Sequence, residues 1–457
     1  MHDARLARVT AYAAAAAMGG FLFGYDSAVI NGAIAGIEHR FPSSPGMTGF
    51  VVAADLPGAA IGAAIAGATA DRLGRLGAMR VAGVLFAITA IASAVPFSIW
   101  DLAFWRLMGG VAIGMASVIA PTYIGEIAPA AFRGRLASLQ QLAVVLGIVM
   151  SQLVNYALAM AGGGSAGHLG PLQTWQWMFL VNLLPAALYL WLSTVMPESP
   201  RYLVRVGRDD AARSVFAKTE GGDPAEHVAD TRRALGGEVT SKLGDLRGPH
   251  LLLPIVWTGI GLCALQQLCG INVIFYYSAT LWESVGVEES SSLLLSLFTS
   301  VINLIGTFIA ISLVDKLGRR PLLMTGSAGM AVALAVTAYA FSHQADGGVL
   351  PFGWGLVALV GASFFVLFFA LSWGAVVWVL LGEMFPLSIR AAAMSVATAT
   401  QWLTNWLVTL TFPTLSAWSL PATYLIYAAF AALSFFFVRR RVAETKGRSL
   451  EAISEAS

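Results

Sequence analysis

The stretch from Leu265 to Ser278 places amide and phenol side chains inside a segment that is long and apolar enough to be embedded in a membrane. Its three amides and two phenols are Gln266, Gln267, Asn272, Tyr276 and Tyr277. The amides donate and accept hydrogen bonds without carrying charge, which suits a ligand made of hydroxyl groups, such as a sugar. Gly270 can loosen the helix between them. Single amides also join membrane helices to one another, but three amides followed by two phenols favour a binding site.

Two charged side chains, Asp26 and Arg106, also lie within apolar segments. A charge in a membrane span is costly and is expected to face the protein interior beside a partner. Burial and a guanidinium act in opposite directions on the pKa of a carboxyl group, so their balance can change with conformation. We therefore expect Asp26 to take a proton from outside, to release Arg106 and to return the proton inside. A purely structural ion pair is the alternative.

Membrane helices must position these side chains, because 57% of the 457 residues are hydrophobic and only 11% are charged. The mean hydropathy is +0.74. Soluble domains, by contrast, have about 25% charged residues. Apolar runs of about 20 residues predict twelve spans, centred near residues 22, 60, 88, 114, 148, 184, 265, 303, 331, 367, 402 and 428.

The predicted spans divide an all-α membrane protein into two six-helix halves. We expect one six-helix bundle in 1–196, a cytoplasmic linker with short surface helices in 197–249, a second bundle in 250–438 and a cytoplasmic tail in 439–457. Of the 27 Lys and Arg residues, all but Arg40 and Arg106 fall on one predicted side of the membrane. They lie at the termini, in the 197–249 linker (the insert) or in the span connections on the same side as these. Because positive residues mark the cytoplasmic side, both termini are predicted to be cytoplasmic in a multi-pass plasma-membrane protein.

Two charged motifs occur once in each half of the chain. Asp71–Arg75, after the second predicted span, recurs as Asp315–Arg319 after the eighth. Glu126–Arg133 recurs in the same way as Glu383–Arg390. The repeats predict a duplicated six-helix unit, which is the arrangement of an alternating-access transporter.

The charged motifs on the cytoplasmic side are expected to form a gate that bridges the two halves and separates as the inside opens. The alternative is a solvated surface network that contributes about 0 to 1 kcal/mol per pair. Duplication in both halves favours the gate. Its expected members are Asp71, Arg75, Glu126, Arg133, Glu198, Arg201, Asp315, Arg319, Glu383 and Arg390.

Motifs distributed over nearly the whole chain carry a resemblance to a known family. They are Gly19–Asp26, Asp71–Arg75, Gly125-Glu126 with Arg133-Gly134, Pro197–Arg201, Gln266-Gln267 with Gly270–Asn272, Asp315–Arg320, Glu383–Arg390 and Glu444–Gly447. The joint pattern resembles the sugar porter family of the major facilitator superfamily, and is similar to facilitative glucose transporters and bacterial proton-coupled sugar symporters. The resemblance implies two pseudo-symmetric six-helix bundles, the major facilitator fold.

The resemblance also implies which residues contact the sugar or shape its cavity. They are Phe23, Gln141, Ile148, Gln266, Gln267, Asn272, Asn303, Phe369, Gly374, Trp378, Gln401 and Trp402. Amides supply donors and acceptors to hydroxyl groups, and indoles offer a flat apolar face. Trp378 and Trp402 lie well inside their spans, which disfavours an interfacial role for them. Ile148 matches the glucose transporters, whereas Cys263–Leu265 departs from a Gln-Leu-Ser sequence associated with glucose selectivity.

Comparison with the family pattern also indicates which residue carries the proton. Proton-coupled members carry an acid at the position of Asp26, where facilitative glucose transporters have Asn. Asn182 stands where some proton-coupled members have an acid, so Asp26 is expected to carry the proton alone. Asp55, in the second span, has no counterpart that the resemblance can place. Gly110 and Gly114 have the spacing of small residues that lets two membrane helices pack closely.

The predicted function is inward symport of a monosaccharide with a proton by alternating access, with glucose or another hexose expected and xylose as an alternative. A facilitative sugar uniporter and a proton symporter for cyclitols such as inositol remain open. A sugar sensor is disfavoured because 439–457 is too short for a signalling tail.

The sequence does not predict catalysis. It shows no nucleophile–base pair, metal-ligand cluster or phosphate-binding loop, so neither enzyme activity nor a metal or other cofactor is expected. The expected partners are the monosaccharide, the proton and the lipid bilayer, without nucleic acid, and the expected state is a monomer.

Overall fold

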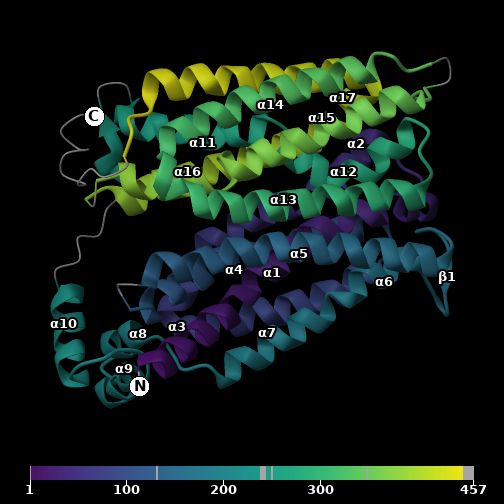
Figure 1. Cartoon of the computed structure of the whole chain (residues 1–457). Helices are drawn as coiled ribbons and strands as arrows, with labels where there is room; N and C mark the ends of the chain where they lie inside the picture. Colours follow the sequence, from purple (N-terminus) through teal and green to yellow (C-terminus); the bar gives the residue numbers. More distant parts are fainter. Residues whose placement is uncertain are drawn as a thin grey trace. The chain divides into compact units, whose positions relative to one another are not determined.

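The computed structural model, shown in Figure 1, describes residues 2–129, 132–236, 243–248, 251–345, 348–386 and 388–445. Ten helical segments in this part of the chain are long and apolar enough to cross a membrane. Two of them, Pro45–Ala94 and Arg390–Arg441, contain a break in helical geometry, at Gly74 and Ser419 respectively. Each of these two therefore supplies two spans. The described helices accommodate the twelve predicted spans, and the all-α membrane fold is confirmed.

Contacts between residues divide the chain into two compact units. Unit 1 contains Met1–Val29, Ala54–Ser151 and Leu169–Val239, and unit 2 contains Ile30–Ala53, Gln152–His168 and Thr240–Ser457. The helices α1 (His2–Arg40) and α5 (Arg133–Gly162) contribute residues to both. The units therefore follow the packing of the helices rather than the order of the chain.

Unit 1 is built on α3 (Asp55–Ala94) and α4 (Ile99–Ile127), which pack against each other. A Cβ atom added at Gly110 would lie 1.9 Å from the carbonyl oxygen of Asp55. One added at Gly114 would lie 2.0 Å from the carbonyl oxygen of Ala59. Glycine at both positions lets the two backbones touch, as the spacing predicts.

The remaining elements of unit 1 pack around these two helices or form a separate cluster. Both α6 and α7 contact α3. The three short helices of the insert, α8 to α10, share a small hydrophobic core that includes Leu203, Phe216 and Val228. The bounds are β1 (His168–Leu169), β2 (Leu172–Gln173), α6 (Thr174–Val181), α7 (Leu183–Val195), α8 (Pro200–Arg205), α9 (Asp209–Thr219) and α10 (Pro224–Gly236).

Unit 2 contains long helices that run side by side in Figure 1, with α14 in contact with both α15 and α17. Two of its spans consist of two helices separated by a short break, α11 with α12 and α15 with α16. The bounds are α2 (Pro45–Ala53), η2 (Leu243–Leu246), β3 (Arg247–Gly248), β4 (Leu251–Leu252), α11 (Pro254–Leu268), α12 (Ile271–Ser284), α13 (Glu289–Leu317), α14 (Arg319–Phe341), α15 (Phe352–Leu371), α16 (Trp373–Met384) and α17 (Arg390–Arg441). The antiparallel strands β3 and β4 pair Arg247 with Leu252.

Candidate functional site

The span made of α11 and α12 is interrupted at Gly270, as the sequence predicts. Gly270 has a φ of 81°, in the left-handed region that favours glycine. A Cβ atom there would also lie 2.6 Å from the ring of Tyr427. Both the backbone conformation and the lack of space therefore require glycine. A break inside a bundle exposes backbone and polar side chains to an internal site.

A chain of hydrogen-bonded amides lies at this break. Asn272 Nδ2 donates to Gln267 Oε1 at 2.6 Å, and Gln267 Nε2 donates to Gln266 Oε1 at 3.1 Å. Gln266 Nε2 in turn donates to the carbonyl oxygen of Trp373 at 2.7 Å. Gln266 and Gln267 are buried and Asn272 is half-buried. The structure thus brings the three predicted amides together and fixes the direction in which each donates and accepts.

Trp373, which the sequence did not single out, accepts the last hydrogen bond of this series of amides. It opens α16 directly after the break in α15, and its indole N–H donates to Ser327 Oγ at 3.0 Å and to the carbonyl oxygen of Leu323 at 3.2 Å. Ser434 Oγ donates to Ser327 Oγ at 2.7 Å. In the sequence, Trp373 looks like one more apolar residue of a span, and only its neighbours in space identify its role.

The other predicted sugar-contact residues of unit 2 lie on four different helices. Asn303 on α13 and Trp402 on α17 are buried. Phe369 borders the α15–α16 break, where a Cβ atom added at Gly374 would lie 3.3 Å from its ring. Two further residues are half-buried, namely Trp378 and Gln401. Tyr276 and Tyr277 are buried too, and the Tyr277 hydroxyl donates to the carbonyl oxygen of Thr409 at 2.9 Å.

Three predicted sugar-contact residues belong to unit 1, namely Phe23, Gln141 and Ile148. All three are half-buried, the first on α1 and the other two on α5. These two helices touch where a Cβ atom added at Gly24 would lie 1.9 Å from the carbonyl oxygen of Val144. The segments that carry the three residues therefore lie side by side within unit 1.

A second pair of amides, Asn31 on α1 and Gln152 on α5, lies in unit 2 and was also missed. Asn31 Nδ2 donates to Gln152 Oε1 at 3.0 Å. Gln152 Nε2 donates to the carbonyl oxygen of Phe275 at 3.3 Å, and the Ala279 N–H donates to Asn31 Oδ1 at 2.9 Å. Phe275 and Ala279 are one turn apart on α12, so the two amides are hydrogen-bonded to both ends of that turn. The sequence could have indicated both residues, because each is an amide within an apolar span.

The residues predicted to handle the proton lie together in unit 1. Arg106 Nη1 donates to the carbonyl oxygen of Asp26 at 3.2 Å and lies 3.9 Å from Asp26 Oδ2. Arg106 Nη2 lies 2.9 Å from Asp55 Oδ2, and Asn182 Nδ2 donates to Asp26 Oδ1 at 3.0 Å. The exposed fractions of Asp26, Asp55 and Arg106 are 6%, 1% and 2%. Asp26 and Arg106 thus lie together as expected, but the shorter contact of Arg106 is with Asp55.

Two glycines of α4 make room for these carboxyl groups. A Cβ atom added at Gly109 would lie 3.3 Å from Asp26 Oδ2, and Gly110 is the residue on which the backbone of Asp55 packs. Gly109 and Gly110 follow Arg106 by one helical turn, so the three residues share one face of α4. The sequence Arg106-Leu-Met-Gly-Gly110 therefore supplies both the cation and the space for its two partners.

The charged motif of unit 1 is organised around Gly74. This residue has φ 82° and ψ 169°, which interrupts α3 before the helix resumes. The N–H groups of Arg75 and Leu76 donate to Glu198 at 3.1 and 3.2 Å. The start of a helix stabilises a carboxylate in this position. The Arg75 guanidinium donates to both carboxylate oxygens of Glu126, at 2.8 and 2.7 Å.

The corresponding motif of unit 2 has the same local structure. Gly318 has φ 92° and ψ 166°, and it directly precedes α14. The N–H groups of Arg319 and Arg320 both donate to Glu444 at 3.0 Å. Arg319 Nη2 lies 2.8 Å from Glu383 Oε1. The two sequence repeats therefore share both a backbone conformation and a set of partners.

The other expected gate residues are only partly described. Asp71 Oδ1 lies 2.5 Å from Arg205 Nη1 and 3.6 Å from Arg75 Nη1. Arg390 Nε donates to the carbonyl oxygen of Phe385 at 3.0 Å. The side chains of Arg133 and Asp315 lie outside the described part of the structure. A gate between the two halves of the chain stays a prediction.

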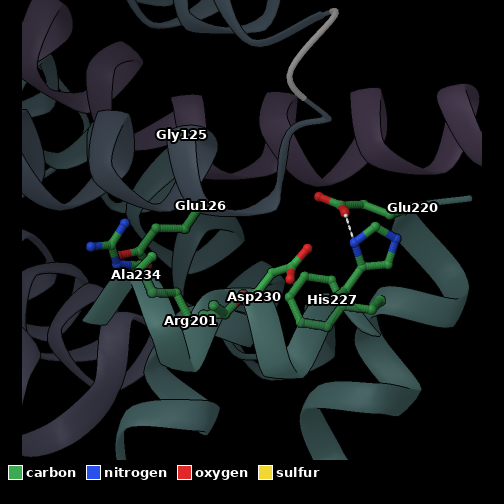
Figure 2. A pocket seen from close by; sticks show the side chains of 9 residues that line it. Gly125, Glu126, Arg201, Glu220, His227, Asp230 and Ala234 are labelled. Atoms are coloured by element: carbon green, nitrogen blue, oxygen red, sulfur yellow. Dashed lines mark ion pairs between the residues drawn. The ribbon is translucent and has the colours of Figure 1, made fainter. Parts of the chain in front are cut away.

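A cavity of about 200 Å³ lies between the end of α4 and the insert helices, and Figure 2 shows side chains that line it. His227 Nδ1 lies 3.1 Å from Glu220 Oε2 at one side of it. Glu126, the partner of Arg75, lies at the other side, so the insert lies next to the charged motif. The lining residues are Gly125, Glu126, Arg201, Phe216, Glu220, His227, Asp230, Thr231 and Ala234. Among the residues that the structure describes, no three His, Cys, Asp or Glu side chains are grouped as metal ligands.

Broken spans, buried polar groups at membrane depth and duplicated motifs are features of a secondary transporter. The chain belongs to the sugar transporter family, because the family model "Sugar (and other) transporter" matches residues 12–456. This membership confirms the family that the motifs indicate.

Individual relatives agree with this assignment. The chain is 48% identical to a glucose transport protein of Synechocystis sp., over 95% of each chain. It is 35% identical to the D-xylose-proton symporter of Escherichia coli, over 96% of this chain and 93% of the relative. The inward-open structure of the xylose transporter XylE from E. coli matches with a TM-score of 0.83 and 32% identity, over 98% of this chain and 99% of that one. The major facilitator fold is thereby confirmed.

Proposed function

We propose that this protein carries a monosaccharide into the cell together with a proton, by alternating access. The observation that carries the proposal is the buried ion pair of Asp26 and Arg106. The same protein also contains a series of neutral amides that are hydrogen-bonded to one another. An ionisable group at membrane depth is a candidate proton site. The proton coupling named for the similar D-xylose-proton symporter supports this function.

Glucose or another hexose is the proposed substrate. The relative with 48% identity is a glucose transport protein, and a XylE structure was solved with 6-bromo-6-deoxy-D-glucose bound. Gln266, Gln267 and Asn272 offer neutral donors and acceptors that suit hydroxyl groups. A site without charge binds a neutral sugar loosely enough to release it on the other side. Xylose and cyclitols such as inositol have the same kind of hydroxyl groups and are the competitors to test.

The proposed coupling uses the weak contact between Asp26 and Arg106. A proton that reaches Asp26 from outside removes its charge and with it the attraction to the guanidinium. The sugar-loaded protein can then change conformation. Loss of the proton to the inside restores the attraction and returns the empty protein to its first state. Sugar and proton thus move together because the sugar-loaded protein changes conformation only when Asp26 is protonated.

The charged motifs are the proposed gate on the cytoplasmic side of the plasma membrane. The uneven distribution of Lys and Arg supports cytoplasmic termini and a cytoplasmic position for Arg75, Glu126, Arg319 and Glu383. The pairs Arg75–Glu126 and Arg319–Glu383 would hold the helix ends of each unit together. The gate would close when these two clusters engage one another.

Uptake of labelled glucose into vesicles that contain the purified protein tests the function. With acid outside, glucose should accumulate above its outside concentration, and a protonophore should abolish the accumulation. Asp26→Asn should lose accumulation while exchange of labelled for unlabelled glucose persists. Asp101→Asn, in the first turn of the helix that carries Arg106, is the control and should accumulate glucose normally. Accumulation by Asp26→Asn would contradict the proposed coupling.

A competition panel identifies the substrate. Unlabelled glucose, other hexoses, xylose and inositol are each added in excess to the uptake of labelled glucose. The proposal expects hexoses to compete most strongly. Stronger competition by xylose or inositol would assign the protein to that substrate instead.

A further inference from the structure

Arg106 has two carboxyl partners in unit 1, and the coupling described above uses only Asp26. Asp55 makes the closer contact with Arg106, at 2.9 Å against 3.9 Å for the Asp26 carboxyl group. It is also the more deeply buried, with 1% of its surface exposed against 6% for Asp26. Asp55 Oδ1 has no hydrogen-bond partner among the described residues. The contact with Arg106 is therefore the main compensation for a charge on Asp55.

The charges of this site do not balance when both carboxyl groups are ionised. One guanidinium neutralises one carboxylate, and an additional uncompensated charge in a buried site is strongly unfavourable. The three side chains are neutral when one of the two carboxyl groups binds a proton. Because Asp55 makes the shorter contact with Arg106, the proton belongs on Asp26 in this arrangement.

We propose that Asp55 is the alternate partner of Arg106 and thereby sets the pH at which Asp26 binds and releases its proton. When Asp26 is protonated, Asp55 holds the guanidinium in place. When Asp26 loses its proton, the two carboxylates compete for the same cation. Asp55 acts through Arg106 and is a positioning residue rather than a proton carrier. The inference rests on the proposed proton-coupled function.

Among the residues that the structure describes, the acids paired with Arg106 are Asp26 and Asp55. Tyr25 of α1 donates its hydroxyl to the carbonyl oxygen of Met178 at 3.2 Å. Tyr189 of α7 faces α1 at Gly19, where an added Cβ atom would lie 3.0 Å from its hydroxyl oxygen. Beyond Arg135, α5 carries no charged residue.

Asn182, between α6 and α7, can bond both forms of Asp26. Its NH₂ group donates to the ionised carboxylate at 3.0 Å in the observed arrangement. The amide oxygen has no hydrogen-bond partner among the described residues. A rotation of the amide would present this oxygen to the O–H of a protonated Asp26. Asn182 therefore adds no charge to the site, and the charge balance is set by Asp26, Asp55 and Arg106.

The test is the pH dependence of sugar uptake by Asp55→Asn in the full-length protein. Without the Asp55 carboxylate, Arg106 acts on Asp26 alone and stabilises its ionised form, so a higher proton concentration is needed. The outside pH that gives half-maximal glucose uptake should fall by about 1 to 3 units, the usual effect of one nearby charge. Asp55→Glu, which keeps the carboxylate, should retain the profile of the natural protein.

Glucose exchange in the same vesicles shows whether each variant is folded. If Asp55→Asn does not exchange glucose, Asp55→Ser removes the same charge with a smaller side chain and takes its place. An exchange-competent variant without the carboxylate that keeps the natural pH profile overturns the inference about Asp55. If the natural protein itself shows no uptake driven by a pH gradient, the proposed function fails instead, so the two failures are distinguishable.

Discussion

The two units hold their buried polar groups in different chemical forms. In unit 1, Arg106 lies between two carboxyl groups, and the site changes its net charge when it gains or loses a proton. In unit 2, the break between α11 and α12 is occupied by a chain of amides that stays neutral at any physiological pH. Under the proposed function, the two substrates are recognised by separate means, the proton by charge balance and the sugar by fixed hydrogen-bonding groups.

The same two units are alike at their duplicated charged motifs. Gly74 and Gly318 share a backbone conformation, and each starts a helical segment whose first N–H groups bind a glutamate, Glu198 or Glu444. The two repeats therefore share the local structure of their charged motifs, whereas their buried polar sites differ. Substitutions in one site, with proton coupling and sugar affinity both measured, test whether the two sites act separately.

The largest expected effect is on stability, when Arg106 is removed. Arg106→Ala leaves two carboxyl groups buried without a cation and should lower the free energy of unfolding by about 3 to 5 kcal/mol. Denaturant unfolding in detergent micelles measures the loss. Arg40→Ala, at the exposed end of α1, should change it by less than about 0.5 kcal/mol. Adding Asp26→Asn and Asp55→Asn to Arg106→Ala should recover much of the loss, because no buried charge remains. A triple variant as unstable as Arg106→Ala would contradict the charge-balance argument.

Substitution of a glycine of α4 should have the next largest effect on stability. Gly110→Ala would place a methyl group 1.9 Å from the carbonyl oxygen of Asp55 and must push α3 away from α4. Overpacking of this kind should cost about 1 to 3 kcal/mol of unfolding free energy and should impair proton-driven accumulation. Gly67→Ala on α3 is the matched control, since an added Cβ atom there meets nothing within 4 Å. Equal stability of the two variants would show that the α3–α4 contact does not position Asp55.

A substitution in the amide chain of unit 2 should lower the affinity for sugar without changing proton coupling. Gln267→Ala removes the link between Asn272 and Gln266. The loss of one or two hydrogen bonds should raise the KM for glucose about tenfold. The number of protons moved per sugar should stay the same, as measured by parallel pH and tracer records. Gln344→Ala, in the loop after α14, should leave KM unchanged. A change in the proton-to-sugar ratio would mean that the two sites are not separate.

The smallest expected effect concerns the two glutamates that bind helix starts. Glu198→Gln and Glu444→Gln should each lower the free energy of unfolding by about 1 kcal/mol, because each loses a charge next to helix N–H groups. Similar losses in thermal unfolding would support the structural equivalence of the two motifs. A large loss in one variant and none in the other would show that the repeats have diverged in function.

The sequence predicted most of the fold, because apolar runs, positive residues and repeated motifs are local signals. It also predicted Gly270, the amides beside it and the pairing of Asp26 with Arg106. It could not assign Asp55 a partner, because this requires knowing which faces of α3 and α4 meet. The spacing of Gly110 and Gly114 identified close packing, but not the helix that packs there. Trp373 acts through its backbone carbonyl oxygen, which no residue type reveals.

The coupling of sugar to the proton is tested by recording the pH outside vesicles when glucose is added with equal pH on both sides. If sugar enters with a proton, the outside medium should become alkaline at a rate proportional to glucose uptake, and Asp26→Asn should abolish the signal. Glucose uptake by the natural protein without any change in outside pH would contradict the account and leave passive transport of sugar in its place.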